Sequence, residues 1–123
     1  MMTVEEVREI LEAKVLIGRD RMNAPVETAC GSDLMSDVLA FVKDKTVLIT
    51  GMINPHVVRT SEMLDITCIV FSRGKMPSEE ILEEAEECGI TVMSTERTTY
   101  TACGELDLHG LPGTKKRAGA EGT

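Results

Sequence analysis

Aromatic side chains are nearly absent from this chain of 123 residues, which has one Tyr, two Phe and no Trp. A hydrophobic core built without them must consist of Val, Ile, Leu and Met, and an apolar fraction of 42% can supply it. Proteins that bind single-stranded nucleic acid stack bases on aromatic rings within basic grooves. The shortage of rings therefore counts against that class of partner.

Positive charge is also scarce, with 13 basic against 21 acidic residues and a formal net charge of −8. Three of the basic residues, Lys115, Lys116 and Arg117, lie close together near the C-terminus, so the rest of the chain is even more acidic. An acidic surface repels a phosphate backbone. We therefore expect no nucleic-acid partner.

Long apolar runs are missing too, and none approaches the roughly 20 residues that a membrane span requires. The N-terminal stretch MMTVEEVREI is acidic and amphipathic, unlike a signal peptide, so we expect a cytoplasmic protein without a membrane partner. Cys30, Cys68, Cys88 and Cys103 are widely separated and form no CxxC pair. We expect four reduced thiols and no metal site.

What the chain does contain is an alternation of short β-branched runs and amphipathic helical segments. Strands are predicted at 14–17, 26–30, 46–50, 66–71 and 90–93, and helices at 3–11, 32–42, 54–64, 78–88 and 98–109. The last three strands are each followed by a helix, and such units place strands parallel through right-handed crossovers.

This pattern predicts an α/β domain of two or three layers, with a mostly parallel sheet of four or five strands and about five helices. The domain is expected to span residues 1–111, followed by a basic, Gly-rich and disordered tail over 112–123. The second helix is expected to start at Ser32, with Asp33 in its first turn, and to bury this stripe: Leu34, Met35, Val38, Leu39 and Val42. The last helix is expected to bury Tyr100, Cys103 and Leu106.

A candidate ligand site lies where the parallel strands end, because open α/β sheets bind ligands outside the carboxyl ends of their strands. Arg73 and Lys75 form the one basic pair at such a strand end, which suggests an anionic ligand. The candidate ligand-binding residues are Thr50, Gly51, Asn54, Arg73, Lys75, Ser94 and Thr95. The alternative is that these are ordinary polar loop and capping residues.

Catalytic signatures are missing. Gly74-Lys75 is not a P-loop, because Ile69 stands where the first Gly is required and Met76 follows the Lys. His56 and His109 each suit a helix end better than a general base, so no catalytic residue and no cofactor is predicted. Cys30 precedes a predicted helix start, which leaves open whether its thiol is activated or simply packed.

Three stretches resemble the DRTGG domain family, namely Ser32-Asp33-Leu34-Met35-Ser36-Asp37-Val38-Leu39, Met76-Pro77-Ser78-Glu79-Glu80-Ile81 and Ile90-Thr91-Val92-Met93-Ser94-Thr95. The resemblance covers about residues 2–111. Where the name-giving residues should lie, this chain instead has Asn23-Ala24-Pro25-Val26-Glu27-Thr28-Ala29-Cys30-Gly31. The Asp, Arg and paired glycines are largely replaced, which puts any inherited contact in doubt.

The resemblance implies a fold similar to the N-terminal domain of HPr kinase/phosphorylase, a regulatory role, dimerisation and an association with iron-only hydrogenases. Two hypotheses follow. The first is a non-catalytic regulatory module that senses a nucleotide or another anionic metabolite. The second is a homodimeric interaction module that docks on a hydrogenase-related or signalling partner. An enzyme that uses Cys30 or a histidine is the third alternative.

Overall fold

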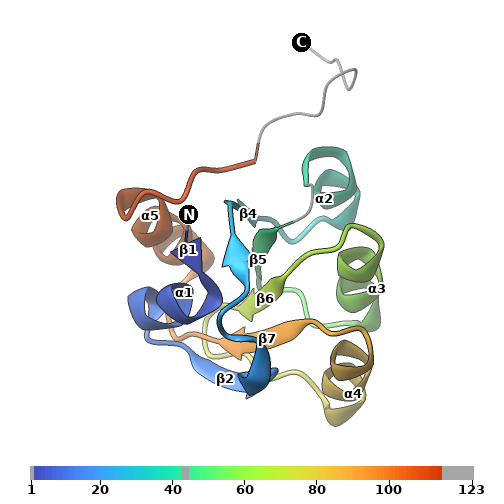
Figure 1. The fold of residues 1–123 in the computed structure, drawn as a ribbon. Helices are drawn as coiled ribbons and strands as arrows, with labels where there is room; N and C mark the ends of the chain where they lie inside the picture. Colours follow the sequence, from blue (N-terminus) through green and yellow to red (C-terminus); the bar gives the residue numbers. More distant parts are fainter. Residues whose placement is uncertain (1, 43–44, 115–123) are drawn as a thin grey trace.

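The computed structural model describes residues 2–42 and 45–114, and these form an α/β fold with five α-helices around a mostly parallel five-stranded sheet (Figure 1). This confirms the predicted fold class. The predicted end of the domain at residue 111 stays a prediction, and most of the expected tail, residues 115–123, lies outside the described residues.

The main sheet contains five strands in the order β2 (Lys14–Ile17), β7 (Thr91–Ser94), β6 (Cys68–Phe71), β5 (Thr46–Thr50) and β4 (Thr28–Gly31). Strands β4 to β7 are parallel, whereas β2 runs antiparallel to β7, with Lys14 opposite Ser94. The start of β2 therefore lies at the same edge of the sheet as the carboxyl ends of the other four strands. We call this the carboxyl edge, and the opposite one the amino edge.

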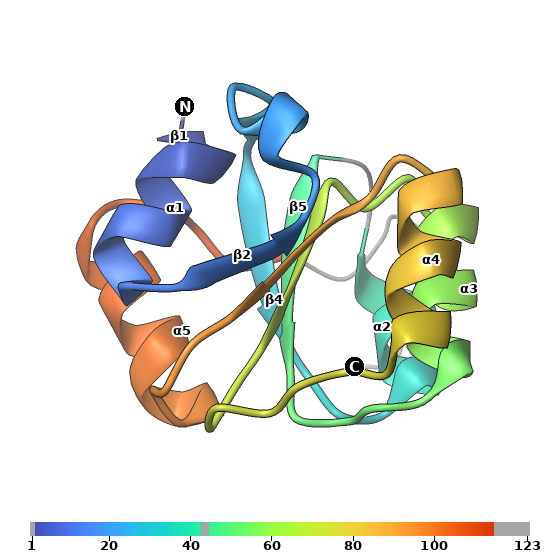
Figure 2. The same ribbon diagram turned by 90° about the horizontal axis from the view of Figure 1, so that it is seen from below.

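Helices cover both faces of the sheet, so the domain has three layers (Figure 2). One face carries α1 (Val4–Leu11) and α5 (Thr99–Leu108), and the other carries α2 (Met35–Phe41), α3 (Pro55–Met63) and α4 (Glu79–Glu87). Every residue of β5, β6 and β7 is buried, as expected for strands covered on both sides. Two apolar clusters result, one on each face of the sheet.

Side-chain caps start four of the five helices. Thr3 and Glu6 form a capping box at α1, and Asn54 caps α3 just before Pro55. Ser78 and Thr98 cap α4 and α5 by accepting hydrogen bonds from backbone N–H groups in the first turn. All four starts agree with the sequence prediction.

The second helix differs from its prediction. It begins at Met35 without a side-chain cap, while Ser32 Oγ accepts a hydrogen bond from Leu34 N at 3.1 Å within the preceding loop. Leu34 is 58% exposed and Leu39 is 39% exposed, so the buried stripe is narrower than expected. The reason is that Ser32 N donates to Ile49 O, which continues β4 past the expected helix start.

Two further expectations need correction. The predicted strand 26–30 is split at Glu27 into β3 (Pro25–Val26), which pairs with β1 (Met2–Thr3), and β4. Tyr100 is 88% exposed rather than buried, because α5 packs on the sheet through Ala102 and Leu106, four residues apart.

The outer edge of β4 pairs with the segment after α5. Ala29 N donates to Pro112 O at 2.9 Å, and Thr114 N donates to Ala29 O at 3.1 Å. Pairing to the sheet thus reaches Thr114. In the described ranges, no helix combines the length and apolar character that crossing a bilayer would take.

Candidate functional site

The loops that contain the predicted ligand residues lie side by side at the carboxyl edge. Thr50 pairs with Phe71, and Phe71 pairs with Ser94, so the loops after β5, β6 and β7 leave the sheet from neighbouring positions. The loop after β4 joins them, because Gly31 pairs with Ile49. The structure thus shows that these strand ends are neighbours, whereas the sequence identified each strand end but not the order of the strands.

The backbone of the loop after β6 is held by hydrogen bonds to the loop after β7. Arg73 N donates to Arg97 O and Gly74 N donates to Thr95 O, both at 2.8 Å. Arg73 and Gly74 have positive φ angles of 59° and 67°, and a Cβ on Gly74 would lie 2.8 Å from Glu96 Oε2. This tight, left-handed turn therefore favours glycine at position 74.

The cationic side chains of this loop remain exposed. Among residues 2–42 and 45–114, neither Arg73 nor Lys75 forms an ion pair, although several other basic residues do. The backbone of Lys75 is fixed, since Ser94 Oγ donates to Lys75 O at 2.8 Å. The loop thus presents two positive charges from an ordered backbone.

Asp33 is a component of this edge that the sequence analysis assigned to a helix. Its Oδ1 accepts hydrogen bonds from Gly51 N at 2.7 Å and from Thr50 Oγ1 at 2.9 Å. The Gly51 N–H, the Thr50 hydroxyl and the nearby charges of Arg73 and Lys75 together lower the pKa of Asp33 against a smaller opposing effect of burial. The carboxyl edge therefore stabilises negative charge.

The remaining residues of the β5 loop are already engaged. Thr50 is buried, and its Oγ1 accepts from Met52 N at 3.1 Å while donating to Asp33. Asn54 Oδ1 accepts from His56 N at 2.8 Å, and Pro55 has no N–H to offer. The start of α3 thus has few spare amide donors, and an anion at this edge would depend on side-chain cations.

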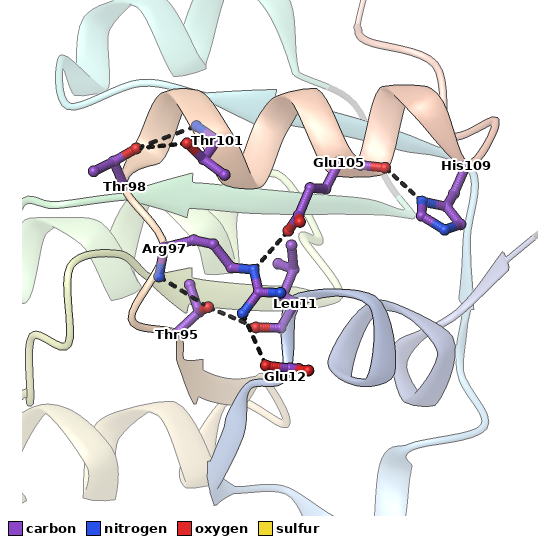
Figure 3. Close-up of polar contacts among 8 residues, drawn as sticks. All are labelled: Leu11, Glu12, Thr95, Arg97, Thr98, Thr101, Glu105 and His109. Carbon is purple, nitrogen blue, oxygen red and sulfur yellow. Dashed lines mark hydrogen bonds and ion pairs between the residues drawn. The ribbon is translucent and has the colours of Figure 1, made fainter.

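Thr95 joins elements together rather than facing the loops. Its hydroxyl donates to Leu11 O at 2.8 Å and its exposed fraction is 1% (Figure 3). Arg97 strengthens the same junction, with Nε 2.6 Å from Glu105 Oε1 on α5 and Nη1 3.3 Å from Glu12 Oε1 after α1 (Figure 3). Of the predicted ligand-binding residues, Thr95 is therefore the least able to contact a ligand, because its side chain is buried and its hydroxyl already donates to Leu11 O.

Lys14 adds a third cation that the sequence analysis did not identify. It is exposed, lies opposite Ser94 in the register of β2 and β7, and forms no ion pair within the part of the chain that the structure describes. Nothing in the run Lys14-Val15-Leu16-Ile17 reveals the direction of its strand. Its position at the carboxyl edge could not have been found without the topology.

Apolar side chains accompany these charges. Leu34, Met52 and Met76 follow β4, β5 and β6, which are neighbouring strands, and they are 58%, 38% and 56% exposed. Exposed apolar groups beside fixed charges can bind a molecule that has both an apolar and an ionic part. The carboxyl edge therefore suits an amphipathic anion better than a simple inorganic one.

The cysteines contribute no activated thiol. Cys30 lies within β4 and not at a helix start, and burial raises the pKa of its thiol, which removes the activation hypothesis. Burial likewise raises the thiol pKa of Cys68, Cys88 and Cys103. All four cysteines are free, and residues 2–42 and 45–114 hold no cluster of three or more His, Cys, Asp or Glu that could bind a metal ion.

Comparison with known proteins now identifies the family. The model of the DRTGG domain matches residues 6–108. This chain belongs to the DRTGG domain family. A solved structure with the same fold is the regulatory region of Clostridium perfringens pyrophosphatase, which comprises CBS and DRTGG domains and was crystallised with its activator, diadenosine tetraphosphate. The TM-score is 0.71 at 22% sequence identity, over 93% of this chain and 50% of that one.

The DRTGG resemblance drawn from the sequence is thus confirmed. The similarity to HPr kinase/phosphorylase and the association with hydrogenases stay predictions.

Proposed function

We propose that this DRTGG domain is a non-catalytic regulatory module that senses a nucleotide or a similar anionic metabolite at its carboxyl edge. The observation that carries the proposal is a pair of exposed cations, Arg73 and Lys75, which form no ion pair with the described residues and lie on a hydrogen-bonded loop of a chain whose net charge is −8. Lys14 extends the positive region towards β2.

The distribution of ion pairs supports this assignment. Five of the nine basic residues within 2–42 and 45–114 lie against carboxylates, as in Arg8–Glu5, Lys45–Glu27 and Arg59–Glu84. Of the four that form no ion pair there, Lys14, Arg73 and Lys75 lie at the carboxyl edge, and Arg19 lies in the loop after β2. Two carboxylates lie near this loop at the carboxyl edge. Asp33 is anchored to the Gly51 N–H and the Thr50 hydroxyl, and Glu96 lies beside Gly74, but neither forms an ion pair with any of the described residues. Arg73 and Lys75 are therefore available to an external anion.

The apolar side chains narrow the ligand class. Leu34, Met52 and Met76 offer apolar contacts for a nucleobase, while Arg73 and Lys75 offer charge for phosphates. Diadenosine tetraphosphate, the activator of the similar pyrophosphatase region, combines bases with phosphates in the same way. That region is twice as long as the matched part and only 22% identical, so it supports the ligand class and not a particular binding mode.

A thermal-shift comparison tests the proposal. The panel consists of ATP, diadenosine tetraphosphate and tripolyphosphate at millimolar concentration, with the wild type and the Arg73→Ala/Lys75→Ala variant. A ligand at 100 times its Kd stabilises the native state by about 2.7 kcal/mol, which raises the midpoint measurably. We expect a shift in the wild type that disappears in the variant. A flat response to all three compounds, with an intact unfolding transition, would remove the nucleotide-sensing function.

A second candidate function is a homodimeric interaction module. Tyr100 and Leu108 on α5 are 88% and 82% exposed, with Gly104 between them at helical spacing, and Met63 on α3 is 72% exposed. Exposed aromatic and methionine side chains are enriched in protein interfaces. Analytical ultracentrifugation of the wild type and the Tyr100→Ser/Leu108→Ser variant tests this, because a homodimer through α5 dissociates in the variant. A wild type that sediments as a monomer at every concentration would eliminate the homodimer and leave a heterologous, hydrogenase-related protein as the partner to test.

A further inference from the structure

Gly51 directly follows β5 at the carboxyl edge, and its backbone conformation does not explain why it is glycine. Its φ angle is not positive, so a residue with a side chain could adopt the same φ. The backbone around it is fixed, because Ser72 N donates to Thr50 O at 3.0 Å where β5 and β6 end. The reason for glycine must therefore be sought in the space around it.

The space that a Cβ on Gly51 would occupy is taken by the side chain of Arg73. Such a Cβ would lie 2.7 Å from Arg73 Nη2, 3.6 Å from Arg73 Cζ and 3.4 Å from Ser72 Oγ. The first of these distances is well inside the roughly 3.5–4.0 Å at which nonbonded heavy atoms attract each other best. The guanidinium thus lies directly against the Gly51 backbone, and a side chain at position 51 would push it away.

The same contact places the guanidinium near an anchored carboxylate. Gly51 N donates to Asp33 Oδ1 at 2.7 Å, and the charge of Arg73 contributes to the lowered pKa of Asp33. Within the described ranges, Arg73 and Asp33 form no ion pair. Close packing on Gly51, rather than a direct contact with the carboxylate, therefore determines where the guanidinium lies.

The hydrogen-bonding capacity of this guanidinium is unused. In residues 2–42 and 45–114 the exposed Arg73 side chain forms neither a hydrogen bond nor an ion pair. A guanidinium has five N–H donors in a planar fork that matches the oxygens of a phosphate. Because its position is already set, less conformational entropy is lost when a ligand binds to it.

We propose that Gly51 is a positioning residue, whose missing side chain seats the Arg73 guanidinium so that a ligand phosphate binds between the loops after β5 and β6. This inference rests on the nucleotide site proposed above and adds to it the place of the phosphate. It also gives Gly51 a role that its own hydrogen bond to Asp33 does not require, since an alanine N–H could donate equally well.

The test is a double-mutant cycle of Gly51→Ala and Arg73→Ala in the full chain, with tripolyphosphate as the calorimetric probe. We expect Gly51→Ala to weaken binding at least about fivefold when Arg73 is present, and by less than about twofold when position 73 is already Ala. The matched control is Gly104→Ala, at a position where an added Cβ meets no other atom within 4 Å. It should bind the probe as the wild type does.

A second readout needs no ligand. The pKa of the Asp33 carboxyl, followed by its ¹³C resonance, should rise in Gly51→Ala because the guanidinium moves away. This rise should shrink in the Arg73→Ala background, where any remaining change reports on the Gly51–Asp33 hydrogen bond. Urea unfolding should show Gly51→Ala to be at least as stable as the wild type, since the displaced group is the end of a flexible side chain.

Arg73→Lys tests the inference without a change at position 51. Lysine keeps the charge but lacks the planar fork, so we expect weaker tripolyphosphate binding than in the wild type. Wild-type binding by Gly51→Ala or by Arg73→Lys, or an equal loss from Gly51→Ala in both backgrounds, would overturn the inference. If the wild type binds neither tripolyphosphate nor a nucleotide, the proposed function fails, and the Asp33 titration decides whether Gly51 positions Arg73.

Discussion

Replacing Asp33 by Asn should weaken the fold slightly while it strengthens anion binding. The Asn side chain can still accept from Gly51 N and Thr50 Oγ1, so the loop geometry is kept and only the charge is lost. Hydrogen bonds to a charged group contribute about 1 kcal/mol more than neutral ones. We therefore expect the free energy of unfolding to fall by about 1 kcal/mol, which lowers Tm by roughly 4 °C.

Anion binding should change in the opposite direction. The Asp33 charge acts on Arg73 and Lys75 from beyond the 4 Å of an ion pair, and two unit charges 4 Å apart in a water-like medium interact by about 1 kcal/mol, which is the upper limit here. Removing the charge should therefore tighten binding of tripolyphosphate by up to about fivefold. Calorimetric titration at pH 7 measures this directly, and the difference between the two proteins should shrink as salt is added.

The pH dependence of stability provides an independent check that the Asp33 charge stabilises the fold. Because the pKa of Asp33 is lowered in the folded state, its stabilising effect is present above the unfolded-state pKa and is lost as pH falls through the lower folded-state value. Urea unfolding should therefore separate the wild type from Asp33→Asn at neutral pH and not at strongly acidic pH. Asp107→Asn, an exposed carboxylate on α5, is the control. Unchanged or weaker tripolyphosphate binding by Asp33→Asn would refute the electrostatic reasoning.

Three further substitutions test the fold by urea unfolding. Gly74→Ala should lower the free energy of unfolding by about 1–2 kcal/mol because of its positive φ, with a further cost from contact with Glu96. The control is Gly104→Ala, at a position in α5 where an added Cβ meets no other atom within 4 Å. It should raise the free energy of unfolding by about 0.5–1 kcal/mol. Leu106→Ala empties a fully buried position and should lower it by about 2–5 kcal/mol. A Gly74→Ala protein as stable as the wild type, or a destabilised Gly104→Ala, would contradict the backbone geometry described.

The elements of the fold were largely predictable because most helices carry local signals. Thr3, Asn54, Ser78 and Thr98 are caps whose side chains act within one helical turn, so the sequence around each is sufficient to locate it. The start of α2 was not predictable, because Ser32 belongs to the continuation of β4 along β5, a contact that no local pattern encodes.

The candidate site was predictable only in part. The order of strands and helices indicated the carboxyl edge, and Arg73 and Lys75 are found there with unpaired side chains within the described residues. Lys14 and Asp33 were missed for different reasons. Lys14 reaches the edge through an antiparallel strand whose direction the sequence does not determine, and Asp33 hydrogen-bonds to groups about 18 residues further along the chain.

The most direct test of nucleotide sensing is a calorimetric titration of diadenosine tetraphosphate into three proteins. These are the wild type, Arg73→Ala/Lys75→Ala and the control Arg19→Ala/Arg59→Ala, which loses the same charge away from the site. We expect saturable binding to the wild type and the control, and binding weakened at least about tenfold in the Arg73/Lys75 variant, since each lost charged contact contributes about 1.5–3 kcal/mol. Equal binding by all three proteins would contradict the assignment of the site to the carboxyl edge.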